Sequence, residues 1–240
     1  MNRDSSLYIF IYASVMVIIV AAVLSFTAET LKPIQKENVR IEKIQNILAS
    51  VNISSTKKNA AELFDKYIPE ENRIAINSKG EKVEADAFNI NLKVENKKGI
   101  EDRTLPLFIV NMDDGTKKTI IPLLGTGLWG PIWGYLSFEP DNNTIFGAVF
   151  DHKGETPGLG ADINKDWFQK PFKNKSIFEG DKFVSINVHK GGKGAAQRAG
   201  DLKHGVDAIS GGTITSKGLE KMVFDCLEGY QKYLKNNKDK

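Results

Sequence analysis

Hydroxyl side chains and two glycines are grouped near the C-terminus, in the segment Asp207-Ala-Ile-Ser210-Gly211-Gly212-Thr213-Ile-Thr215-Ser216. An amphipathic pattern follows directly, which predicts that this segment leads into a helix. The first N–H groups of a helix have no partner within it, and the helix dipole favours negative charge there. The segment is therefore suited to bind a phosphate group, although a hydroxyl-rich helix cap with a glycine turn would show the same spacing.

Two glycine motifs elsewhere match nucleotide-binding patterns but lack the required context. Gly125–Gly130 reads G-x-G-x-x-G, yet Pro131 and a strand-like run follow where a dinucleotide site needs a helix. Gly192-Lys193 is followed by Gly194, where a phosphate-binding loop needs Ser or Thr. The sequence therefore predicts no dinucleotide site and no P-loop.

Composition excludes further classes of function. The chain has 33 Lys+Arg against 30 Asp+Glu, and a net charge of +3 does not indicate a nucleic-acid partner. A single cysteine, Cys226, excludes a disulfide framework and is interpreted as a buried small hydrophobe. The three histidines (His152, His189, His204) have no second ligand at metal spacing, and no Ser-His-Asp arrangement occurs. We expect no metal site and no catalytic residue.

The segment from Asp207 to Thr213 closely resembles the D-x-x-(S/T)-G-A-T signature of FMN-binding domains whose flavin is attached through its phosphate to a threonine. The acceptor in that family is the last residue of the signature, which corresponds to Thr213; Thr215 is the less favoured alternative. Gly212 stands where the family has alanine, so the residue stays small. The resemblance implies a covalent FMN phosphoester made by a separate flavin transferase. The residues implied at the phosphate end are Asp207, Ser210, Gly211, Gly212, Thr213 and Thr215.

Two further blocks support the resemblance. Residues 155–163 (ETPGLGADI) are similar to the E-T-P-G-L-G segment of the same family, and residues 127–130 (GLWG) resemble a segment that starts a strand near the flavin. Trp129 fits a flavin contact and a core position equally well. The residues implied to approach the flavin are Thr156, Leu159, Gly160, Leu128 and Trp129.

With the N-terminal apolar segment, these blocks make the chain similar to the family of C subunits of Na+-translocating NADH:quinone reductases. The G subunit of the Rnf complex, which receives electrons from ferredoxin, is the alternative, and an anchored scaffold without redox function is a different class. The long stretch before Gly125 favours the first family. The resemblance implies a flavoprotein that carries electrons toward quinone, coupled to Na+ export, with other membrane subunits as partners and without binding NADH itself.

The N-terminal segment Leu7–Phe26 contains 20 residues and no charge, which is roughly 30 Å of helix and matches a bilayer core. The run is too long and its N-terminal flank too neutral for a cleaved signal peptide. We therefore expect one retained transmembrane helix. More basic residues follow this segment (Lys32, Lys36, Arg40, Lys43) than precede it (Arg3). The positive-inside rule would therefore keep the following domain in the cytoplasm, but this rule is weak for large domains. The resemblance implies a bacterial inner-membrane protein with a periplasmic FMN domain.

The sequence predicts an α+β fold in three parts. These are a single transmembrane helix in residues 1–28, a helical neck in 29–70, and an FMN-binding domain rich in antiparallel sheet in 71–240, with the FMN motifs in 125–220. Helical patterns occur in residues 34–51 and, after a cap-like Ser55-Thr56, in residues 57–68 before Pro69.

Short strand-like runs and one long helix make up the rest of the domain. The predicted strands are IAIN, FNINLKV, LPLFIVNM, KTIIPLL, WGYLSF, IFGAVF and KFVSINV, and a short helix is expected in 161–172. Turns are expected at Lys79-Gly80 and at residues 113–115. The final helix is predicted to begin with Ser216 as its cap and to bury a stripe of Leu219, Met222, Val223, Cys226, Leu227, Tyr230 and Leu234.

Overall fold

The computed structural model of this chain describes residues 5–238. Two short segments lie outside the described part: residues 1–4, with Arg3 and the start of the predicted anchor, and residues 239–240 of the predicted domain. The chain divides into two compact units, one that ends at Lys43 and one that begins at Ile44. The second unit contains every segment of the predicted flavin site.

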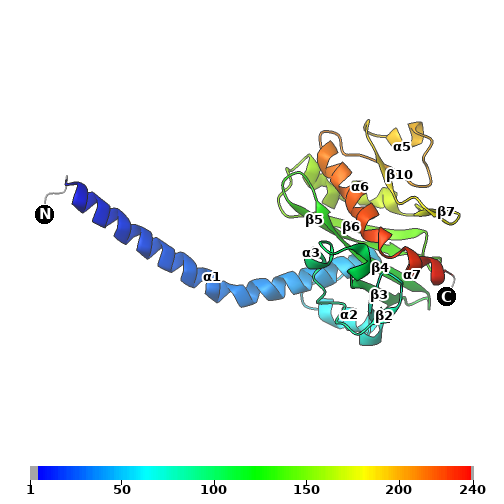
Figure 1. Cartoon of the computed structure of the whole chain (residues 1–240), viewed down its shortest axis with the longest axis horizontal. Helices are drawn as coiled ribbons and strands as arrows, with labels where there is room; N and C mark the ends of the chain where they lie inside the picture. Colours follow the sequence, from blue (N-terminus) through cyan, green and yellow to red (C-terminus); the bar gives the residue numbers. More distant parts are fainter. Residues whose placement is uncertain (1–4, 239–240) are drawn as a thin grey trace. The chain divides into compact units, whose positions relative to one another are not determined.

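One long helix, α1 (Ser6–Ser50), contains both the predicted transmembrane segment and the predicted helix of residues 34–51 except its last residue, Val51 (Figure 1). Its most apolar window has a mean hydropathy of 2.7 and no buried residue, so α1 is long and apolar enough to cross a membrane. Pro33 lies inside the helix, where it removes one N–H donor without ending the helical path.

A six-stranded antiparallel sheet with the order β2-β1-β3-β4-β5-β6 forms the centre of the second unit. Its strands are β1 (Arg73–Ile76), β2 (Lys82–Val83), β3 (Leu105–Asn111), β4 (Lys117–Thr126), β5 (Pro131–Phe138) and β6 (Ile145–His152). The predicted turns join β1 to β2 and β3 to β4. Gly80 and Gly115 have φ angles of 81° and 80° there, which glycine adopts without steric cost. The predicted α+β class with an antiparallel sheet is confirmed.

The C-terminal helix packs on this sheet as α6 (Thr213–Glu228), followed by α7 (Gln231–Asn236). Every residue of the predicted apolar stripe is buried. Burial raises the pKa of the Cys226 thiol to about 11, in keeping with a packing role. The Tyr230 hydroxyl donates to Pro106 O at 2.7 Å, which ties the end of the stripe to β3.

Several predicted element boundaries are wrong for local reasons. The predicted strand FNINLKV contains no strand; Asn91 accepts a hydrogen bond from Lys93 N and begins the short helix α3 (Leu92–Glu95). Ser216 is not the cap of the predicted C-terminal helix, because α6 begins three residues earlier, after Gly212, and it ends at Glu228 before the separate helix α7. The predicted strand in 182–188 is interrupted at Ser185, whose φ of 60° is incompatible with an extended chain.

Short elements complete the unit. The predicted helix of residues 57–68 is confirmed as α2, although it starts after Asn59 rather than at Ser55-Thr56, and the helix expected in 161–172 is divided into η3, α4 and η4. The remaining bounds are α2 (Ala60–Tyr67), η1 (Glu70–Asn72), η2 (Ile100–Asp102), η3 (Gly160–Asn164), α4 (Asp166–Gln169), η4 (Lys170–Phe172), β7 (Phe178–Glu179), β8 (Lys182–Phe183), β9 (Asn187–His189), α5 (Ala195–Arg198) and β10 (Gly205–Asp207).

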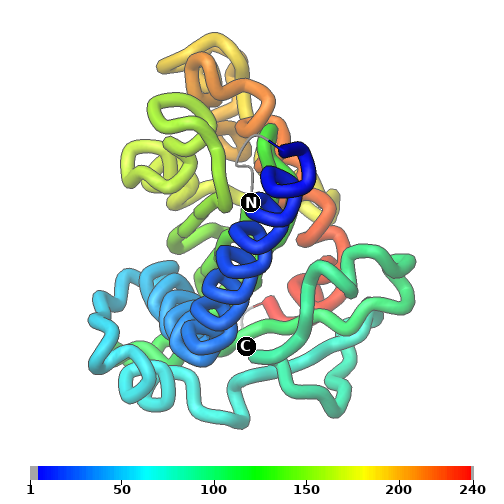
Figure 2. The backbone as a smooth tube through the Cα atoms, turned by 90° about the vertical axis from the view of Figure 1, so that its left-hand side faces the viewer, coloured from blue at the N-terminus to red at the C-terminus, as the bar shows by residue number. Residues whose placement is uncertain are grey.

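The two ends of the sheet unit are built from different parts of the chain. Residues 51–90 gather at one end, and the segments that follow β6, residues 155–210, gather at the other (Figures 1 and 2). The helix α3 lies beside the end of β4, where Asn96 Nδ2 donates to Leu124 O at 3.1 Å. The start of α6 lies at this second end, together with the segments that the sequence singles out for flavin binding.

Candidate functional site

The three blocks that resemble the FMN family meet at one end of the sheet. Residues 127–130 form the turn between β4 and β5, closed by a 2.8 Å bond from Gly127 N to Gly130 O. The pairing of β5 with β6 reaches His152, so the loop after β6 starts beside this turn. A Cβ on Gly218 would overlap Thr126 O, which places the second turn of α6 against the end of β4.

A buried carboxyl group, that of Glu155, connects the three blocks. Its Oε1 accepts a hydrogen bond from Trp129 N at 2.8 Å, and its Oε2 accepts one from Thr215 Oγ1 at 2.5 Å. Only 5% of Glu155 is exposed. A Cβ on Gly127 or Gly160 would lie 2.6 Å from one of its oxygens, so both glycines permit this close packing. Sequence reasoning did not select Glu155, because its partners are distant in the chain.

Thr213 and Thr215 differ in the availability of their hydroxyl groups. Thr213 is partly exposed, and its hydroxyl has no hydrogen-bond partner within the described part of the chain. Thr215 is 1% exposed, and Glu155 accepts from its hydroxyl. The first bond of the α6 backbone runs from Ser216 N to Gly212 O, so the preceding N–H groups have no acceptor within the helix. An anion at this helix start would meet Thr213 rather than Thr215.

Large apolar side chains are exposed around this helix start. Trp129 is 69% exposed and therefore does not occupy a core position. Leu159 lies so close to Gly211 that a Cβ there would be 2.7 Å from its Cδ2. The exposed apolar side chains here are Leu128, Trp129, Leu159 and Ile214. A planar aromatic ring system joined through a chain to a phosphate, as in FMN, fits this combination of surfaces.

The remaining predicted residues lie around the same loops. Thr156 and Ser210 are exposed, whereas Gly160 and Gly212 are buried. A Cβ on Gly212 would be 3.0 Å from the Leu159 carbonyl carbon and 3.1 Å from Gly160 N. The glycine that replaces the family's alanine therefore leaves room for the loop after β6 to approach the signature closely.

Asp207 is committed to the glycine-rich loop before it. Its carboxylate accepts hydrogen bonds from Gly194 N at 2.5 Å and Ala196 N at 2.8 Å. Burial acts to raise the pKa of Asp207, but the N–H groups of residues 194–196 and the charge of Arg198 outweigh it and hold the pKa below its usual value. This loop therefore binds an internal carboxylate, and Asp207 supports local structure in the signature.

Asp207 is expected to make stability depend on acid pH. A carboxyl whose pKa is lowered by folding contributes stability above its unfolded pKa of about 3.9 and loses it as the pH falls through the lower folded value. Melting temperatures of the full chain and of Asp207→Asn should therefore differ most near neutral pH and converge below about pH 4. A difference that stays constant down to about pH 3 would contradict this role.

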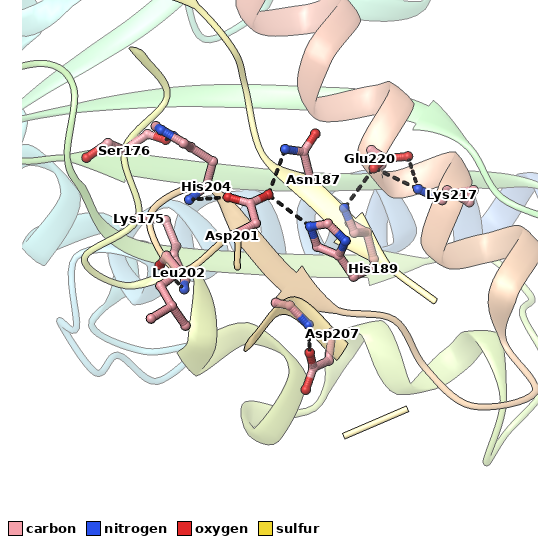
Figure 3. A network of polar contacts seen from close by, with 12 residues as sticks. Lys175, Ser176, Asn187, His189, Asp201, Leu202, His204, Asp207, Lys217 and Glu220 are labelled. Carbon is pink, nitrogen blue, oxygen red and sulfur yellow. Dashed lines mark hydrogen bonds and ion pairs between the residues drawn. The ribbon is translucent and has the colours of Figure 1, made fainter. Parts of the chain in front are cut away.

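A polar network fixes the strands that lead to the signature (Figure 3). Asp201 accepts hydrogen bonds from Asn187 Nδ2 at 2.8 Å and from His204 N at 3.1 Å, and its Oδ2 lies 2.9 Å from His189 Nε2. Glu220 of α6 accepts from Val188 N at 2.7 Å, which joins the helix to β9. The parallel pair β9–β10 is thus held against α6, immediately before the signature.

The histidines serve these local contacts. His189 is adjacent to Asp201, His204 Nδ1 lies 2.5 Å from Ser176 O, and His152 Nδ1 accepts from Glu155 N at 3.2 Å. Among residues 5–238, no group of three or more His, Cys, Asp or Glu side chains is arranged to hold a metal ion.

An available hydroxyl at a helix start, unpaired N–H groups and a surrounding apolar surface are together suited to a phosphate-bearing cofactor. Residues 127–228 match a family model described as the FMN-binding domain. This match includes the β4–β5 turn, the loop after β6 and the whole of α6. Residues 127–228 of the second unit are therefore an FMN-binding domain.

Relatives similar over most of the chain define the family more narrowly. The C subunit of the Na(+)-translocating NADH-quinone reductase from Pasteurella multocida is 32% identical over 238 residues, covering 91% of this chain and 88% of that protein. The crystal structure of the C subunit from Parabacteroides distasonis is 44% identical, has a TM-score of 0.75, and covers 85% of this chain and 96% of its own. The Shewanella oneidensis NqrC structure is 28% identical with a TM-score of 0.67, over 83% of this chain and 98% of its own.

The chain belongs to the C-subunit family of the Na(+)-translocating NADH-quinone reductases. It is accordingly a flavoprotein subunit of an oxidoreductase complex, with other subunits of that complex as its partners.

Proposed function

We propose that this chain carries FMN as a phosphoester on Thr213 Oγ1 and relays electrons within a Na+-translocating NADH:quinone reductase. The observation that carries the proposal is the contrast between Thr213, whose hydroxyl is available, and Thr215, which is buried and bonded to Glu155. Bound FMN supplies the ability to accept and release electrons, and the chain supplies attachment, position and protection from water.

Each residue has a role set by its position. The unpaired N–H groups at the start of α6 offset the negative charge of the phosphate. Ser210 and Gly211 are exposed beside Thr213 and leave the phosphate accessible during attachment. Leu128, Trp129, Leu159 and Thr156 present exposed surface to the flavin from the two neighbouring loops.

Attachment requires a separate enzyme, a flavin transferase. The bond formed joins Thr213 Oγ1 to the FMN phosphorus. The bond broken is the phosphoanhydride of a flavin dinucleotide donor, from which a nucleoside monophosphate leaves. Among residues 5–238, no histidine forms a hydrogen bond with Thr213 that would take the hydroxyl proton, and the transferase is proposed to supply this base.

We further propose that the chain lies in a bacterial inner membrane. Residues 1–28 form the single transmembrane anchor, residues 29–70 a helical neck, and residues 71–240 a periplasmic FMN domain. The exposed apolar part of α1 supports the anchor. Neighbouring membrane subunits pass electrons to and from this flavin, and their reaction couples quinone reduction to Na+ export.

The test is to produce the full chain in bacterial membranes with and without a flavin transferase. With the transferase, the chain should give a flavin-fluorescent band that persists on a denaturing gel, because a phosphoester survives unfolding. Its flavin should be reduced by NADH only when the other subunits are present. A dark band from cells in which the same transferase modifies another substrate would reject the covalent site.

A further inference from the structure

We propose that Glu155 is a positioning residue of the flavin site, which fixes the Leu128–Trp129 turn and the start of α6 against the loop after β6. The inference rests on the proposed function but assigns a role to a side chain that need not touch the flavin. Its carboxyl oxygens are each used by a different segment, one by a backbone N–H and one by a side-chain hydroxyl.

The chemistry of both contacts favours a carboxyl group. Trp129 N–H can only donate, and the Thr215 hydroxyl donates in the observed geometry, so an acceptor with two oxygens serves both. Glutamine would accept from Trp129 N through its oxygen and donate through its amide to a rotated Thr215 hydroxyl. Glu155→Gln therefore retains both contacts without the charge, whereas Glu155→Ala removes both.

The Trp129 contact matters because that turn has little other support. Its two large side chains, Leu128 and Trp129, are exposed, and the turn is closed by one bond between Gly127 and Gly130. The bond from Trp129 N to Glu155 fixes the backbone between these side chains. Without it, the apolar surface proposed to cover the flavin would lose its attachment to α6.

The Thr215 contact acts on the other side of the site. It holds the Thr215 hydroxyl inside the protein, where 1% of the residue is exposed, and turns the first residue of α6 outward. Glu155 thereby sets the relative position of the acceptor, Thr213, and the apolar surface. Both must be correct for the ring of a flavin fixed through its phosphate to lie on that surface.

The experiment compares the full chain carrying its flavin with Glu155→Ala, Glu155→Gln and a matched control, Glu95→Ala. Glu95 is also buried and also accepts from a backbone N–H, Thr104 N at 2.8 Å, and from a side chain, Lys98 Nζ. None of its hydrogen-bond partners belongs to the flavin motifs. Glu95→Ala therefore reports the cost of losing any such buried carboxylate.

Two readouts are required, quenching of flavin fluorescence by iodide and hydrogen exchange of the Trp129 N–H. Glu155→Ala should make the flavin more accessible to iodide and speed exchange at Trp129 by about tenfold or more. Glu155→Gln should restore both toward the original values. Glu95→Ala should lower the melting temperature but leave both readouts unchanged.

Three results would each overturn the role: no change in iodide access and Trp129 exchange in Glu155→Ala, equally large increases in Glu155→Gln, or the same increases in Glu95→Ala. If Glu155→Ala does not accumulate, Thr215→Val removes one of the two contacts and should give a partial gain in iodide access. Hydrogen exchange needs no flavin. If the chain carries no flavin in cells with an active transferase, the covalent site is rejected. If Glu155→Ala nevertheless speeds exchange at Trp129, the positioning role is supported independently.

Discussion

Thr213→Val is expected to remove the covalent flavin completely while leaving the fold intact. Valine has nearly the shape of threonine but no hydroxyl, so the proposed phosphoester cannot form. The hydroxyl has no partner among the described residues, and the side chain is partly exposed, so the free energy of unfolding should change by less than about 0.5 kcal/mol. Gel fluorescence and thermal unfolding of the full chain measure the two effects.

Thr215→Val is the matched control and should show the opposite pattern. It removes the donor to Glu155 Oε2 and leaves a buried acceptor unpaired, which costs about 1–3 kcal/mol. For a chain of this size, each kcal/mol lowers the melting temperature by about 2–4 °C. The flavin should remain, and peptide mapping should find it on Thr213. Fluorescence retained in Thr213→Val, or a flavin mapped to Thr215, would contradict the assignment.

Much of the fold could be predicted because its signals are local. The stripe of the C-terminal helix and the β3–β4 turn depend on residues close in sequence, and both are found in the structure. The start of α6 could not be placed in the same way. Ser216 resembles a cap, yet its hydroxyl donates to Gly212 O and its oxygen accepts from Ile209 N. Whether the Ser216 side chain caps the helix or bonds back to the preceding loop depends on how that loop is buried.

In the flavin site, too, local features could be predicted and features that depend on distant residues could not. The signature and the two supporting blocks could be read from residue types, but their meeting at one end of the sheet depends on strand register. Glu155 and the exposure of Trp129 are properties of the assembled blocks. Asp207 reads as a signature residue in sequence, whereas its carboxylate binds N–H groups of a loop more than ten residues earlier.

Gly160→Ala is expected to disrupt the site more than any surface change, because its Cβ has no space. The new carbon would overlap Thr215 Oγ1 and would lie 2.6 Å from Glu155 Oε2, at the centre of a buried hydrogen bond. Overpacking costs about 1–3 kcal/mol. Breaking the bond adds about 1–3 kcal/mol. A loss of about 3 kcal/mol lowers the melting temperature by about 6–12 °C in a chain of this size.

Gly154→Ala, in the same loop, provides the control. No atom lies within 4 Å of its Cβ position, and its φ is not positive, so stability and flavin content should match those of the unchanged chain. Gly160→Ala should reduce both, because the displaced Thr215 shifts the first turn of α6, which bears Thr213. If Gly160→Ala melts and binds flavin like Gly154→Ala, then the close contact between Gly160, Glu155 and Thr215 does not determine the position of the acceptor.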